Sequence, residues 1–163
     1  MKEESNVSSE TYILKTETKS NVSRETLNDI YYMQLALKQA KKGFNNNEIP
    51  VGCIIVENNR IIAKAYNKKE KNQKAIDHAE IIAISRANKK IKNWRLDKCI
   101  MYVTMEPCMM CCGAIEQSRI KKVIYGCKNE FYGYIEKCDK IDSYYLYTEE
   151  CKTIMQDFFK RKR

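Results

Sequence analysis

The chain contains a single histidine, His78, which stands two residues before a glutamate, Glu80. Later in the chain the stretch Pro107–Cys111, with the sequence PCMMC, supplies the thiols of Cys108 and Cys111. One imidazole nitrogen and two thiolates are three ligands for an ion that takes four, and zinc accepts this mixture of nitrogen and sulfur best. Because structural zinc sites use four protein ligands, three ligands indicate a catalytic site. We therefore expect one zinc ion per chain.

Glu80 could take part in catalysis by such an ion. Zinc lowers the pKa of bound water toward neutrality, so that a nearby group must take up a proton and later deliver it to a leaving group. Glu80, two residues from His78, can do both. The combination of His-x-Glu with Pro-Cys-x-x-Cys is a known signature of zinc-dependent nucleobase deaminases, in which the glutamate is the acid and base and does not bind the metal.

The neighbouring cysteine, Cys112, is an alternative ligand. It lies four residues after Cys108, a spacing that also shares one face of a helix, so that helix geometry alone does not exclude it. The spacing of the signature favours Cys111. We interpret the other five cysteines as small buried apolar residues: Cys53, Cys99, Cys127, Cys138 and Cys151.

The candidate ligands need elements that bring them together. Apolar residues at steps of three and four predict helices over residues 26–44, 78–87, 108–117 and 149–159. Runs rich in β-formers predict strands over residues 51–56, 61–65, 99–104, 122–126 and 144–147, and residues 68–74 are predicted to form a polar loop. Strands separated by helices imply an α/β fold with a mixed sheet covered by helices.

The expected helices place the ligands at helix beginnings. Cys108 and Cys111, three residues apart in a first turn, share one helix face. The N-terminus of a helix also lowers the pKa of a thiol toward the thiolate form that metals bind. Pro107 suits this position because the missing N–H has no helical partner there. His78 begins the preceding helix, which places its ring in the same layer.

The chain has 163 residues, of which 44% are hydrophobic and 31% charged, a composition typical of one soluble globular domain. Residues 1–25 contain four Lys or Arg and five Glu, a net charge of −1, so that the rest of the chain carries +10. We interpret residues 1–25 as a flexible polar tail and residues 26–163 as the catalytic domain. The positive charge suggests an anionic partner, although a lysine-rich genome would also produce it.

The beginning of the chain has no apolar stretch and many acidic residues, so we expect neither a secretion signal nor a transit peptide. No run approaches the ~18 apolar residues of a membrane-spanning helix. Clustered cysteines in a reducing compartment point to metal binding or catalysis. We therefore expect a cytoplasmic protein, with a nuclear or organellar location left open.

The stretch Met101–Gly126 (MYVTMEPCMMCCGAIEQSRIKKVIYG) closely resembles the core of the tRNA-specific adenosine deaminases, both the bacterial enzymes and the catalytic subunit of the eukaryotic heterodimer. Glu48–Gly52 resembles the start of the first strand in that family, and Asp77–Glu80 resembles its zinc and proton-transfer motif. Three shorter stretches also match family members: Asn93–Leu96, Gly126–Glu130 and Asp157–Arg161.

The resemblance implies a three-layer, cytidine deaminase-like fold with a mixed central sheet of about five strands. It implies hydrolytic deamination of adenosine to inosine at the wobble position of tRNA anticodons. The implied assembly is a dimer that binds the anticodon stem-loop, either a homodimer or a heterodimer with a related deaminase-like subunit. Asn67 matches a family position that contacts the base.

RNA contacts are expected at Asn129, where bacterial members usually carry aspartate, and at the four basic residues Lys160, Arg161, Lys162 and Arg163. These basic residues would equally suit a solvated helix end. Between Tyr132 and Cys151 the chain is shorter than in the bacterial enzymes.

Three other functions compete with tRNA editing. A deaminase of a free base or nucleotide, such as guanine, cytosine or deoxycytidylate, would share the zinc motif, but the positive charge and the Ser118–Ile120 stretch favour RNA. A noncatalytic RNA-binding partner subunit can lose the catalytic glutamate, whereas Glu80 is present. A purely structural zinc domain would have no use for Glu80.

Overall fold

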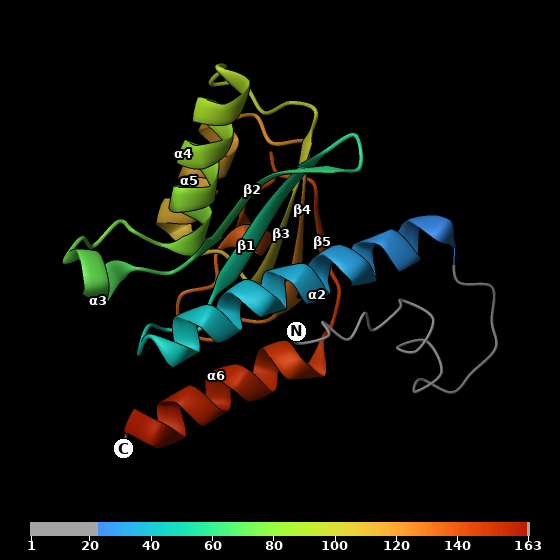
Figure 1. Cartoon of the computed structure of the whole chain (residues 1–163). Helices are drawn as coiled ribbons and strands as arrows, with labels where there is room; N and C mark the ends of the chain where they lie inside the picture. The colour runs from blue at the N-terminus through green and yellow to red at the C-terminus, as the bar shows by residue number, and fades with distance from the viewer. Residues whose placement is uncertain (1–22, 163) are drawn as a thin grey trace, which may run out of the picture.

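A five-stranded sheet in the order β2-β1-β3-β4-β5 forms the centre of the computed structural model, which describes residues 23–162 (Figure 1). Its strands are β1 Gly52–Glu57, β2 Arg60–Tyr66, β3 Cys99–Met105, β4 Lys122–Cys127 and β5 Ser143–Tyr145. Strand β1 pairs antiparallel with β2 and β3, whereas β3, β4 and β5 run parallel to one another. The predicted mixed sheet is therefore confirmed.

Helices cover both faces of the sheet (Figure 1). Helices α4 (Ala79–Ile91) and α5 (Met109–Gln117) lie on one face, and α2 (Arg24–Asn45) and α6 (Glu149–Lys162) lie on the other. Two short helices lie in the connections: α3 (Lys69–Asn72) and the 3₁₀ helix η1 (Ile135–Lys137). None of the helices in the described part of the chain is long and apolar enough to cross a membrane.

The alternation of side chains along the strands divides the core in two. Successive residues of a strand point to opposite faces of the sheet. In β1, Cys53 and Ile55 belong to the core under α4 and α5, whereas Ile54 and Val56 belong to the core under α2. All four are buried. Continuous apolar runs are expected for strands that are covered on both faces.

Strand β1 begins at a glycine that α2 requires. A Cβ atom on Gly52 would lie 2.0 Å from the carbonyl oxygen of Ala36 and 2.5 Å from the backbone nitrogen of Ala40. Helix α2 therefore packs directly on the backbone of this strand. The close packing fixes the preceding loop, which carries Glu48, against the rest of the fold.

The structure corrects several predicted element limits. Helix α2 begins two residues early, at Arg24, because the Ser23 hydroxyl accepts a hydrogen bond from the backbone N–H of Thr26 at 3.2 Å. The polar stretch 68–74 is not entirely loop, because α3 forms within it. Strand β5 begins one residue earlier than expected, and η1 was not predicted. The expected polar tail 1–25 is too long, because Ser23 caps α2 and Arg24 and Glu25 belong to it, while residues 1–22 lie outside the described residues.

Candidate active site

The three candidate ligands meet where two helices begin. His78 is the N-cap residue of α4 and Cys108 is the N-cap residue of α5, both with extended backbone, and Cys111 lies in the first turn of α5. The Nδ1 atom of His78 lies 3.7 Å from Sγ of Cys108 and 3.5 Å from Sγ of Cys111. Helices α4 and α5 contact each other on the same face of the sheet, which holds these atoms together.

The spacing of these donor atoms fits a tetrahedral zinc ion. Zinc bonds of about 2.3 Å to sulfur and about 2.0–2.1 Å to nitrogen require a nitrogen–sulfur separation of about 3.6 Å at a tetrahedral angle. The two observed separations, 3.7 and 3.5 Å, bracket that value. Within residues 23–162, these three side chains are the one group of His, Cys, Asp or Glu placed to share a metal ion.

The neighbouring thiol of Cys112 lies elsewhere. Its Sγ donates to the carbonyl oxygen of Pro107 at 3.7 Å, and its side chain is buried in the core under α4 and α5. It therefore does not join His78. The difference arises because one further residue along a helix turns the side chain by about 100°.

The thiols of Cys108 and Cys111 influence each other's protonation. A hydrogen bond from Cys111 lowers the pKa of Cys108 to about 4. The same hydrogen bond, together with burial, raises the pKa of Cys111. The hydrogen bond to Cys108 raises the pKa of His78 against the opposing effect of burial. The group thus contains one readily formed thiolate next to an imidazole, which is a strong donor set for a borderline-soft cation.

Glu80 lies in the first turn of α4, where its carboxyl interacts with His78 and with the Cys111 side chain. Its side chain is only 4% exposed. Burial raises the pKa of the Glu80 carboxyl, while its own backbone N–H and His78 oppose the increase. An upward shift of the pKa means that the buried carboxyl holds a proton more readily than an exposed one.

Asn67 follows the last residue of β2 and is 5% exposed. The backbone N–H of Lys68 donates to the carbonyl oxygen of Asp77 at 3.0 Å. This bond closes the loop between β2 and α4. It joins Lys68, which follows Asn67, to Asp77, which precedes the candidate ligand His78.

Asn129 lies in a loop that is attached to the site. Its backbone N–H donates to Glu106 Oε2 at 3.2 Å, and its side-chain oxygen accepts from the backbone N–H of Tyr132 at 3.0 Å. Gly133 forms an isolated β-bridge with Cys108. A Cβ atom on Gly133 would lie 2.5 Å from the Glu106 carboxylate, so the loop packs closely on that side chain.

Sequence reasoning missed Glu106. Glu106 stands between a buried strand and the Pro107–Cys111 motif. A carboxylate that is buried at such a position needs hydrogen-bond donors, and this could have indicated a contact with another segment. The loop that Glu106 holds also carries two strongly exposed aromatic side chains, Phe131 at 88% and Tyr132 at 77%.

The C-terminal basic residues lie in a different layer. Lys160, Arg161 and Lys162 are exposed in the last turn of α6. The Arg161 guanidinium lies 5.6 Å from the ring centroid of Phe44 in α2. The structure therefore places these residues across the sheet from α4 and α5. Arg163 lies outside the described residues.

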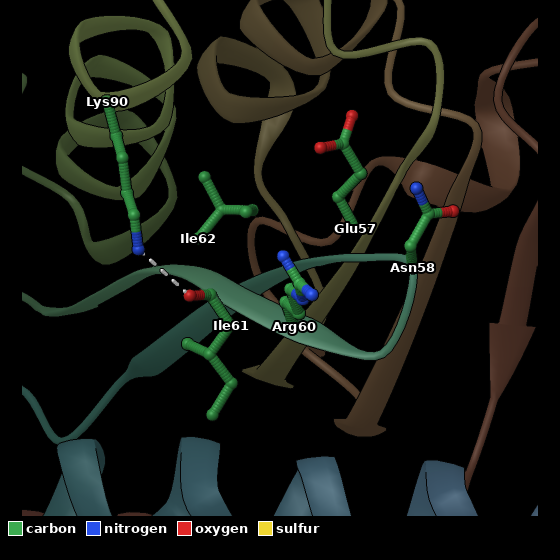
Figure 2. Close-up of a pocket in the computed structure, with 6 residues that line it drawn as sticks. All are labelled: Glu57, Asn58, Arg60, Ile61, Ile62 and Lys90. Carbon is green, nitrogen blue, oxygen red and sulfur yellow. Dashed lines mark hydrogen bonds between the residues drawn. The ribbon is translucent and has the colours of Figure 1, made fainter.

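A surface groove of about 630 Å³ lies far from the metal group along β2. Figure 2 shows it at the turn between β1 and β2, where Lys90 extends from α4 and donates to the carbonyl oxygen of Ile61 at 3.2 Å. Asn67 lies beyond the opposite end of β2. The groove is therefore not part of the candidate active site.

Comparison with known proteins agrees with this geometry. The family model of the MafB19-like deaminases matches residues 27–163, so the chain is a deaminase by class. It is 40% identical over 149 residues to the tRNA-specific adenosine deaminase of Streptococcus pyogenes serotype M1, covering 82% of this chain and 84% of the relative. It is 41% identical over 145 residues to the enzyme of that name from Buchnera aphidicola, covering 83% and 96%. The chain belongs to the family of tRNA-specific adenosine deaminases.

Solved structures agree in fold. A structure from a study of A-to-I editing by tRNA:A34 deaminases superposes with a TM-score of 0.73 at 32% identity, covering 77% of this chain and 99% of the other. The structure of guanine deaminase from Bacillus subtilis superposes with a TM-score of 0.59 at 30% identity, covering 85% and 95%. The cytidine deaminase-like fold is therefore confirmed.

Proposed function

We propose that this protein deaminates adenosine to inosine at the wobble position of tRNA anticodons. One observation carries the proposal: the buried carboxyl of Glu80 lies beside the His78, Cys108 and Cys111 donor group in a chain that belongs to the tRNA-specific adenosine deaminase family. The activity replaces the exocyclic amine on C6 of adenine with oxygen from water and releases ammonia.

His78, Cys108 and Cys111 would hold one zinc ion per chain. Such an ion supplies Lewis acidity, which makes water a nucleophile at neutral pH. The donor atoms fit this role in type and spacing. Cys112 is left out of the proposed ligand set, because its thiol donates to the carbonyl oxygen of Pro107.

Glu80 would move the protons that the reaction requires. Its carboxylate accepts a proton from the attacking water, and the resulting carboxylic acid donates a proton to the departing nitrogen. The raised pKa of Glu80 makes the protonated form accessible during this cycle. Asn67, at the edge of the site, would hydrogen-bond the base. A flipped-out nucleotide is needed because the reacting atom cannot be reached within a stacked helix.

The RNA would contact exposed residues around this site. The chain carries a net charge of +9, which favours binding to phosphates. Phe131 and Tyr132 lie on the loop that is bridged to Cys108, and exposed aromatic rings can stack on nucleotide bases. We also propose contacts from Asn129 and from the basic end of α6, including Arg163. The protein would work as a homodimer, or with a related subunit, in the cytoplasm.

Deamination of a free base is the second candidate, and the structural likeness to guanine deaminase at 30% identity favours it. A substrate panel separates the two. The protein is incubated with an anticodon stem-loop bearing wobble adenosine, and separately with guanine, cytosine and deoxycytidylate. Inosine formation on the stem-loop alone supports the proposal. Turnover of a free base or nucleotide alone would refute it, and turnover of nothing would favour a noncatalytic partner subunit.

A further inference from the structure

Glu48, in the loop between α2 and β1, is fully buried, with 0% of its surface exposed. Its carboxylate accepts three hydrogen bonds. The side-chain Nδ2 of Asn67 donates to Oε2 at 3.3 Å, and the backbone N–H groups of Glu70 and Lys71 donate at 3.2 and 2.7 Å. The last two donors belong to α3, whose first N–H groups have no partner within the helix.

The NH₂ group of Asn67 is therefore turned toward Glu48, and its carbonyl oxygen Oδ1 faces away from Glu48. That oxygen is buried and has no hydrogen-bond partner among the described residues. A buried acceptor without a partner is rare in folded proteins and calls for an explanation.

The position of Asn67 supplies an explanation. The hydrogen bond between Lys68 and Asp77 joins the two ends of the loop from β2 to α4. Asn67 and His78 are the residues that adjoin this bonded pair in the chain. An acceptor held at the edge of a deaminase site suits a base that presents an N–H donor. The exocyclic amine of adenine is such a donor.

We propose that Glu48 is a positioning residue that fixes the Asn67 amide with its carbonyl oxygen toward the substrate, and thereby selects a base that carries an exocyclic amine. This inference rests on the proposed function. Glu48 acts through Asn67 and does not touch the base itself. A structural role, in which Glu48 only anchors α3, is the competing explanation.

The first experiment compares Glu48→Gln with wild type on the anticodon stem-loop. A glutamine keeps one acceptor oxygen for α3, and its NH₂ group can donate, so that the amide of Asn67 is free to turn over. We expect kcat/KM to fall by about tenfold or more, the effect of losing about one hydrogen bond. Zinc content should stay close to wild type, whereas the melting temperature should fall because one N–H group of α3 loses its acceptor. Glu57→Gln, at the far end of β1, is the matched control and should keep full activity.

A double-mutant cycle then separates positioning from structure. If Glu48 acts through Asn67, adding Glu48→Gln to Asn67→Ala causes no further loss of kcat/KM. An equal loss in both backgrounds, or a loss of zinc from E48Q, would show a structural role and overturn the inference. Full activity of E48Q would overturn it as well. If wild type forms no inosine, the proposed function fails instead, whatever E48Q does.

A second measurement does not depend on the folding of E48Q. The Glu80→Gln variant is expected to turn over slowly enough for its affinity to be compared for stem-loops with wobble adenosine and with wobble purine riboside, which lacks the amine. We expect adenosine to bind about tenfold more tightly, and the preference to vanish when Asn67→Ala is added. Equal affinities for the two stem-loops would contradict the proposed orientation of the amide.

Discussion

The Nδ1 atom of His78 lies 3.5 Å from Sγ of Cys111, although 33 residues separate them in the chain. The contact exists because α4 and α5 both begin at the same end of one sheet face. Cys112, the next residue, lies in the same helix turn but donates to the carbonyl oxygen of Pro107. Two adjacent thiols therefore have different environments.

The different environments predict different metal contents for two serine variants. Cys111→Ser removes a thiolate from the donor group, so we expect zinc to fall well below one ion per chain. Cys112→Ser keeps a donor for the Pro107 carbonyl oxygen and should retain about one zinc per chain. Metal analysis after gel filtration measures both. Loss of zinc from Cys112→Ser with retention in Cys111→Ser would reverse the proposed ligand set.

Glu80→Gln should separate metal binding from catalysis. The amide has the size of the carboxyl but cannot accept and return a proton, so we expect inosine formation to fall by about a hundredfold or more. Zinc content should be unchanged, because Glu80 is not in the proposed ligand set. Single-turnover assays on the stem-loop measure the rate. Glu116→Gln, on α5 away from the donor atoms, is the control. A near-normal rate for Glu80→Gln would rule out the assigned role.

The basic end of α6 should contribute to RNA affinity through charge. Replacing Lys160, Arg161 and Lys162 by alanine removes three charges, so we expect the dependence of log affinity on log salt to become shallower by about 2. A matched triple substitution of Lys89, Lys90 and Lys92, at the opposite end of α4 from the donor group, should change the salt dependence less. Titration of a labelled stem-loop at several salt concentrations measures both slopes. Equal slopes would favour a solvated helix end.

Asp29 should make stability depend on pH. The Tyr102 hydroxyl donates to Oδ1 of Asp29 at 2.7 Å, but burial outweighs this bond and raises the pKa of Asp29 above 3.8. A raised pKa means that the protonated form is favoured in the folded protein. Protonated Asp29 therefore contributes to the free energy of unfolding. This contribution is complete below pH 3.8 and is lost as the pH rises through the folded-state pKa of Asp29.

Asp29→Asn has no charge to bury and still offers Tyr102 an acceptor. We expect its melting temperature to exceed that of wild type at pH 7, and the difference to disappear as the pH falls to 3.8. Thermal unfolding across this pH range provides the measurement, with the exposed Asp157→Asn as control. A variant less stable than wild type at pH 7 would show that the ionised carboxylate is worth more to Tyr102 than its burial costs.

The sequence was sufficient for features that depend on local pattern. The run of β-formers in β1 and the helical spacing around Ile81 and Ile84 are patterns that lie within a single element. The element order and the mixed sheet followed from these patterns, and the candidate metal donors followed from the spacing of the His78–Glu80 and Pro107–Cys111 motifs. The turn at Asn58 and Asn59 has φ of 48° and 60°, a conformation that asparagine tolerates.

The tertiary structure decided what depends on contacts between distant segments. It placed Cys111 rather than Cys112 beside His78, because the rotation of α5 against α4 is set by packing on the sheet. It also showed that Glu48 accepts from Asn67, 19 residues away, and stabilises α3 within a stretch that looks like a polar loop. A buried carboxylate has no periodic signature, since its role depends on which donors the fold brings to it. The sequence shows which side chains are present, whereas the folded structure decides which of them contact one another.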